Sequence, residues 1–103
     1  MPDPSAAPSI EPVWFVEATY APDGAEARVP FRAEHVAEAA ARLADGRYAF
    51  VGAFADVSSS VLVVRAASEA EAIALVRDDV YLRNGVWVEV RARPMGMVAL
   101  PEV

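Results

Sequence analysis

The order of apolar periodicities along this 103-residue chain is the feature that most constrains its fold. Four segments are rich in aromatic and β-branched residues and alternate well enough to predict strands, at residues 13–20, 48–54, 60–66 and 86–93. Two other segments, at residues 31–44 and 68–77, have the composition and the apolar spacing of helices. The predicted order is therefore strand, helix, strand, strand, helix, strand.

Local signals at the ends of these segments agree with that order. Gly46 stands just beyond the first predicted helix, where a residue of positive φ commonly ends a helix. Ser68 and Glu71 have the spacing of a capping box, which predicts the start of the second helix. We therefore predict an α+β protein with a ferredoxin-like βαββαβ fold, in which two helices cover one face of a four-stranded antiparallel sheet.

Side-chain alternation divides the predicted sheet into two faces. The face expected beneath the helices carries small and medium apolar residues: Val16, Ala18, Ala49, Val51, Leu62, Val64, Val88 and Val90. The other face mixes aromatic and charged residues: Phe15, Glu17, Tyr48, Phe50, Val63, Arg65, Trp87, Glu89 and Arg91. Its aromatic residues would form a large exposed apolar patch on a monomer, so we interpret this face as a dimer interface, a ligand groove or both. A plain solvent-exposed face is the alternative.

Composition narrows the classes of function. The formal net charge is −6 and all nine basic residues are dispersed arginines, so nucleic acid is not an expected partner. The chain contains no cysteine, which excludes thiol catalysis, disulfides and sulfur-ligated metals. No apolar run approaches the ~18 residues of a membrane span, so we expect no membrane partner. A domain of this size leaves much apolar surface exposed, which dimerisation commonly covers.

The N-terminal segment has its own composition. Residues 1–12 contain four prolines among small and acidic residues and lack the basic and apolar regions of a signal peptide. We predict a flexible tail over residues 1–12, a single domain over residues 13–103 and a cytoplasmic location. A strap over a partner subunit is the alternative role for the tail.

His35 is the only histidine, and it stands one helical turn after Arg32, so both side chains share one face of the predicted helix. Histidine is the side chain best suited to proton transfer near neutral pH, especially where a carboxylate orients its ring. Asp78 and Asp79, directly after the second helix, are the candidates for that carboxylate, and the sequence leaves the choice open. The alternatives are a surface or boundary position for His35, a polar residue that ends the helix for Asp79 and a solvated helix end for Asp78. Arg32 could equally be a solvated helix residue or an ion-pair partner of Glu38 or Asp79.

A series of short motifs runs from Arg32 to Val98: Arg32-x-x-His35, Leu43 with Gly46, Gly52-Ala53, Ser68-x-x-Glu71-Ala72, Asp79 followed by Tyr81, Gly85, and Arg93-Pro94. Their order and spacing resemble the YCII-related family of the dimeric α+β barrel superfamily. The resemblance implies a ferredoxin-like homodimer whose active site is marked by His35 and Asp79, with Arg32 as the arginine before the histidine. Val80 stands where the family usually has proline. Loss of proline restores a backbone donor, so we expect the Asp79 segment to be less rigid or to continue as helix.

The resemblance also implies a reaction class. We expect lyase-, dehalogenase- or hydrolase-like chemistry without a cofactor on a small cyclic or aromatic metabolite, with His35 as general acid or base, Asp79 fixing its tautomer and Arg32 binding an anionic group. The residues expected to bind this ligand are Phe15, Phe50, Tyr81 and Trp87. A non-catalytic dimer that binds a small ligand or a partner domain is one alternative, and a cofactor-free oxygenase or isomerase is another. One histidine among scattered carboxylates gives no metal-ligand spacing, so we predict no metal site.

Overall fold

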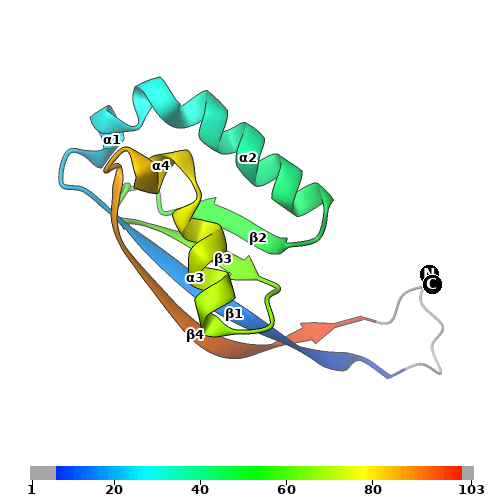
Figure 1. Ribbon diagram of the computed structural model, residues 1–103. Coiled ribbons are helices and arrows are strands. Elements are labelled where there is room, and N and C mark those ends of the chain that lie inside the picture. Colours follow the sequence, from blue (N-terminus) through cyan, green and yellow to red (C-terminus); the bar gives the residue numbers. More distant parts are fainter. Residues whose placement is uncertain (1–6, 101–103) are drawn as a thin grey trace.

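The computed structural model describes residues 7–100 and has its helices on one side of a four-stranded antiparallel sheet (Figure 1). The elements follow in the order β1 (Ser9–Tyr20), α1 (Gly24–Ala27), the 3-10 helix η1 (Val29–Phe31), α2 (Arg32–Ala44), β2 (Tyr48–Ala53), β3 (Ser59–Val64), α3 (Glu69–Arg77), α4 (Val80–Arg83) and β4 (Trp87–Ala99). The strand order β2-β3-β1-β4, antiparallel throughout, confirms the predicted ferredoxin-like fold. The three short helices were not predicted, apart from Phe31 at the end of η1, because three or four residues carry no recognisable periodicity.

The two long helices begin and end as their local sequences require. At the start of α3, the Ser68 hydroxyl accepts a hydrogen bond from the Glu71 backbone N–H at 3.2 Å, and the Glu71 carboxylate accepts one from the Ala67 N–H at 3.0 Å. Gly46 follows the end of α2 with φ +86°, a conformation that side chains with a Cβ rarely adopt. None of the helices in the described part of the chain is long and apolar enough to cross a membrane.

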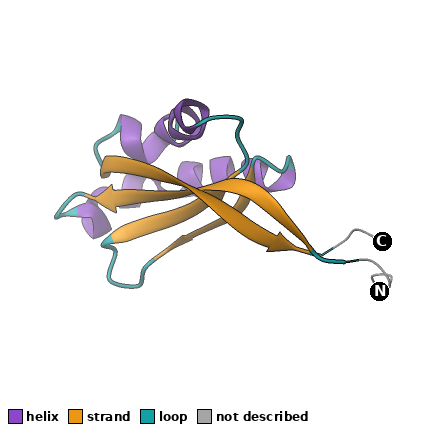
Figure 2. Cartoon of the chain, turned by 90° about the horizontal axis from the view of Figure 1, so that it is seen from below, coloured by secondary structure: helices purple, strands orange, loops and turns teal. Residues whose placement is uncertain are grey.

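The core lies between the two central strands and α3. Val16 of β1, Leu62 and Val64 of β3, and Ala72 and Val76 of α3 are all fully buried. Burial of each valine or leucine side chain contributes about 1.5–3 kcal/mol relative to its exposure, so this cluster fixes α3 on the sheet. All helices of residues 7–100 lie on the same side, and none of the described elements covers the opposite face of the sheet (Figure 2).

The apolar stripe of α2 is packed less tightly than that of α3. Ala39 is buried, but Val36 and Leu43 keep 54% and 43% of their surface exposed. Both line a cavity between α2 and β2, over which this helix lies (Figure 1). The apolar stripe of α2 therefore forms one wall of a cavity.

Two aromatic residues expected on the open face lie in the core instead. Tyr48 and Trp87 are each 1% exposed, whereas Val88, expected in the core, is 59% exposed. The pairing of β2 with β3 is irregular between Tyr48 and Phe50, and that of β1 with β4 is irregular where Tyr20 pairs with Trp87. One extra residue at a strand end reverses the alternation of side chains, which explains the error.

β1 begins at Ser9, so residues 9–12, expected in the flexible tail, form part of the sheet. Residues 9–13 pair with residues 95–99 of β4 and extend the sheet as a two-stranded ribbon (Figure 2). Arg65, just after β3, forms an ion pair with Glu11 that ties the ribbon to the rest of the fold. Residues 1–6 of the predicted tail lie outside the described residues.

Candidate active site

His35 and Asp79 form a direct pair. Nδ1 of His35 lies 2.9 Å from each carboxylate oxygen of Asp79. The Asp79 side chain is fully buried and that of His35 is 12% exposed. A carboxylate so buried must be paired and hydrogen-bonded, and Asp79 accepts a further hydrogen bond from the Tyr81 backbone N–H at 2.8 Å. Of the two candidate aspartates, the structure brings Asp79 to the histidine.

Asp78 faces a different partner. Its carboxylate accepts a hydrogen bond from the buried guanidinium of Arg42 on α2 at 3.0 Å. The same guanidinium lies 5.7 Å from the ring centre of Tyr48 and 3.5 Å from its hydroxyl. Burial raises the pKa of Tyr48 to about 12, so the phenol is neutral at ordinary pH. Asp78 thus ties the end of α3 to α2 and takes no part in the His35 site.

The orientation of Asp79 follows from its position as the N-cap of α4. Its backbone is extended, with φ −66° and ψ 140°, and its side chain accepts the Tyr81 N–H. The expectation that the second helix continues through the Asp79 segment is wrong, because α3 ends at Arg77 and a new helix begins at Val80. The backbone N–H that proline would lack donates to the Glu38 carboxylate at 3.1 Å. Glu38 of α2 therefore accepts the hydrogen bond from the backbone N–H that is present because residue 80 is valine and not proline.

Aromatic rings surround the imidazole. The Tyr81 ring stacks on His35 with centroids 3.8 Å apart and planes 9° apart, and the Trp87 ring meets it edge-on at 5.3 Å. Tyr20 in turn meets both Tyr81 and Trp87 edge-on. Burial raises the pKa of Tyr81, so its phenol also stays protonated near neutral pH. The imidazole is held both by Asp79 and by the stacked tyrosine.

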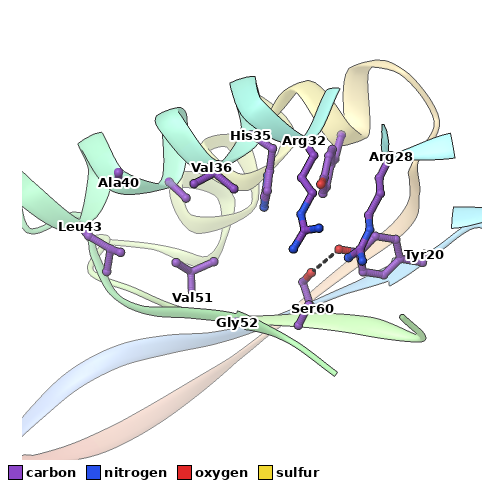
Figure 3. A pocket seen from close by; sticks show the side chains of 13 residues that line it. Tyr20, Arg28, Arg32, His35, Val36, Ala40, Leu43, Val51, Gly52 and Ser60 are labelled. Carbon is purple, nitrogen blue, oxygen red and sulfur yellow. Dashed lines mark hydrogen bonds between the residues drawn. The ribbon is translucent and has the colours of Figure 1, made fainter. Parts of the chain in front are cut away.

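A cavity of about 300 Å³ lies beside the imidazole, between α2 and the sheet (Figure 3). Its walls are formed by Tyr20, Arg28, Arg32, His35, Val36, Ala39, Ala40, Leu43, Val51, Gly52, Ala53, Ser60 and Tyr81. His35 and Arg32 point from α2 into this space (Figure 3). Since Nδ1 faces Asp79, Nε2 is the ring nitrogen available to a bound molecule. The volume is that of the smaller ligand pockets.

The residues predicted from the sequence divide into two groups. Arg32 and Tyr81 line the cavity with His35, whereas Trp87 is buried against the imidazole and is not part of the cavity wall. Phe15 and Phe50, expected to bind the same ligand, lie on the opposite face of the sheet, where they line a separate hollow. The cause is the irregular pairing at the start of β4. It places the Trp87 side chain on the helix side of the sheet, whereas the two phenylalanines lie on the open face.

Sequence reasoning missed three polar residues of the cavity. Arg28 precedes η1, in a segment without periodicity, and no signal pointed to it. Tyr20 was recognised only as the end of a strand. Ser60 is 2% exposed on β3, on the same face as Leu62 and Val64, and its hydroxyl donates to the Tyr20 hydroxyl at 3.2 Å. A serine among apolar core positions is a signal that could have identified it.

Comparisons with known proteins agree with this architecture. The YCII-related domain family matches residues 13–96. Among solved structures, the chain is similar to 5-chloro-2-hydroxyhydroquinone dehydrochlorinase from Burkholderia phenoliruptrix AC1100 in complex with 2,5-dihydroxybenzoquinone. The TM-score is 0.67 at 17% identity, over 79% of this chain and 90% of that one. At this identity the likeness shows the fold alone. A search of curated protein sequences found no match. The family match spans most of the described residues, and the chain belongs to the YCII-related domain family.

Proposed function

We propose that this protein is a small homodimeric enzyme that carries out general acid–base chemistry on a small cyclic or aromatic metabolite. The observation that carries the proposal is the His35–Asp79 pair, a fully buried carboxylate 2.9 Å from an imidazole that borders a cavity. Burying a carboxylate is costly unless hydrogen bonds compensate it, and such groups beside cavities are often functional. A non-catalytic binding protein would not need Asp79 to face His35.

The proposed mechanism begins with the tautomer. Asp79 accepts the Nδ1–H hydrogen, so the lone pair of neutral His35 lies on Nε2, on the side of the cavity. Nε2 removes a proton from a carbon or hydroxyl group of the substrate, and Asp79 stabilises the imidazolium that forms. The electron pair left behind forms a new double bond and expels an anionic leaving group. Arg32 stabilises the negative charge on a substrate oxygen, and each step uses only protein side chains.

The reaction class draws support from the similar solved structure. That protein is a dehydrochlorinase, and the molecule in its complex is a dihydroxybenzoquinone. Elimination of a halide from a hydroxylated ring requires one base and one group that stabilises an oxyanion, which His35 and Arg32 can provide. We therefore propose lyase- or dehalogenase-like chemistry, with hydrolysis by the same base as a further reaction of this class.

Chloride release from a panel of chlorinated hydroquinones tests this proposal. We expect H35Q to lower kcat/KM by about 10²–10⁴-fold, the usual contribution of a positioned general base. The matched control is D78N, which removes the neighbouring carboxylate that faces Arg42, and it should keep kcat/KM within about twofold. An H35Q protein that turns over these substrates as well as the parent would sink the proposal.

A further inference from the structure

The cavity carries fixed positive charge at one end and apolar side chains at the other. Arg28 and Arg32 both point toward Tyr20 and Ser60 (Figure 3). Val36, Leu43 and Val51 line the wall farther along α2 and β2 (Figure 3). The imidazole of His35 lies between these two ends (Figure 3). A molecule that fills the cavity therefore meets cations at one end, hydrocarbon at the other and a base in between.

The two arginines differ from most others in the chain. Five arginines form ion pairs with carboxylates: Arg42, Arg47, Arg65, Arg83 and Arg91. Within residues 7–100, Arg28 and Arg32 have no carboxylate within 4.0 Å, although the chain carries 15 acidic residues against nine basic ones. None of the residues that line the cavity is acidic. The cavity wall therefore carries two cations whose charge nothing in the described protein neutralises at close range.

A contact with Tyr20 places the Arg28 charge at this end of the cavity. The Arg28 guanidinium lies 6.0 Å from the centre of the buried Tyr20 ring. Ser60 donates to the Tyr20 hydroxyl oxygen, so the Tyr20 hydroxyl hydrogen is free to donate to a bound group. Burial raises the pKa of Tyr81, and the charges of Arg28 and Arg32 both lower it. Both guanidinium groups are therefore close enough to act on the phenol that stacks on His35. The cationic end thus lies close to the proposed base.

We infer that the cavity takes an amphipathic carboxylate, with its acid group between Arg28 and Arg32 and its apolar ring against Val36 and Leu43. Two guanidinium groups and a phenol are suited to bind the two oxygens of a carboxylate through charge-assisted hydrogen bonds. In this pose the atom that loses its proton lies between the acid group and the apolar part, below His35. The inference rests on the proposed function only for the role of His35, and it adds Arg28 as a specificity-determining residue.

Direct binding tests the inference without an activity assay. The probes are benzoate, cyclohexanecarboxylate and phenylacetate, each compared with the matched uncharged alcohol or amide by calorimetry. We expect at least one carboxylate to bind at least tenfold more tightly than its uncharged counterpart, because a charge-assisted hydrogen bond is worth about that factor or more. R28Q and R32Q should each remove most of this preference. The matched control is R77Q, an exposed arginine of α3 outside the cavity, which should leave it unchanged.

Several outcomes would overturn the inference. In the parent, these are no binding of any of the three carboxylates, equal affinity for the uncharged counterparts, or an affinity for inorganic phosphate that equals that for the carboxylates. In R28Q and R32Q, it is an affinity for the carboxylates equal to that of the parent. Circular dichroism should show that R28Q and R32Q keep the fold of the parent, since neither side chain forms an ion pair within residues 7–100, so lost binding will not reflect lost folding. If H35Q is fully active while the carboxylate preference holds, the proposed function fails and this inference stands. If H35Q is inactive while R28Q and R32Q bind the carboxylates as tightly as the parent, this inference fails and the proposed function stands.

Discussion

At the scale of single residues, the pair formed by His35 and Asp79 predicts one tautomer of the imidazole. In the parent protein Asp79 accepts from both Nδ1 of His35 and the Tyr81 N–H, so the neutral ring carries its hydrogen on Nδ1. In D79N the Tyr81 N–H should retain the amide oxygen and turn the amide NH₂ toward His35, which forces the Nε2–H form. ¹⁵N NMR chemical shifts of the imidazole distinguish the two forms, and kcat/KM should fall by about 10²–10⁴-fold in D79N. A parent imidazole with its hydrogen on Nε2 would contradict the mechanism.

Glu38 and Val80 supply a second prediction at this scale. E38A leaves the buried N–H of Val80 without its acceptor and should cost about 1–3 kcal/mol in the free energy of unfolding. V80P removes that N–H, and proline suits the first position of α4 because Asp79 before it is extended. Urea unfolding of the E38A/V80P double variant should therefore show that most of the free energy of unfolding lost in E38A is recovered.

The control for this cycle is R83Q. It removes the ion pair between Arg83 and Glu38 at 3.3 Å but keeps the hydrogen bond to Val80. Because half of the Arg83 side chain is exposed, its loss should cost less than about 1 kcal/mol. Additive effects of E38A and V80P would show that Glu38 does not replace the missing proline.

At the scale of elements, the sequence was sufficient for the order of strands and helices, because periodicity and caps are local properties. It was not sufficient for the ends of β2 and β4, where one extra residue changes which face a side chain takes. This is why Trp87 joined the site and Phe50 did not. Arg32, His35 and Asp79 could be found from residue type and family resemblance. Arg28 could not, because its place depends on the chain path through α1 and η1.

The contact between α2 and β2 gives a prediction of pH dependence. Burial raises the pKa of Tyr48 from 10.0 to about 12. Between these values the unfolded chain loses the phenol proton while the folded protein keeps it, so stability is present below about pH 10 and falls as pH rises toward 12. The loss should reach roughly 2–3 kcal/mol. Urea unfolding from pH 9 to 12 measures this slope, and Y48F should reduce it; an unchanged slope in Y48F would show that other groups cause it.

At the scale of the whole molecule, the sheet face that carries no described helix is the candidate interface of the proposed homodimer. Phe50 and Phe54 are each 53% exposed there, and with Phe15 and Val61 they line a hollow of about 370 Å³. A second copy of the chain suits this patch, because in a two-fold dimer the same apolar surface covers itself. Gly52 and Ala53 border both this hollow and the cavity beside His35. A partner seated on the open face would therefore adjoin the cavity.

This arrangement predicts a monomer when charge is placed in the hollow. F50E introduces a carboxylate into the apolar hollow of both copies, where the proposed interface would bury a charge without a partner. Sedimentation velocity should show the parent as a dimer and F50E as a monomer that keeps its helical circular dichroism. V29E is the matched control, since Val29 is 69% exposed on η1 outside both the hollow and the cavity, and it should remain dimeric. A parent that sediments as a monomer, or an F50E protein that stays dimeric, would place the interface elsewhere.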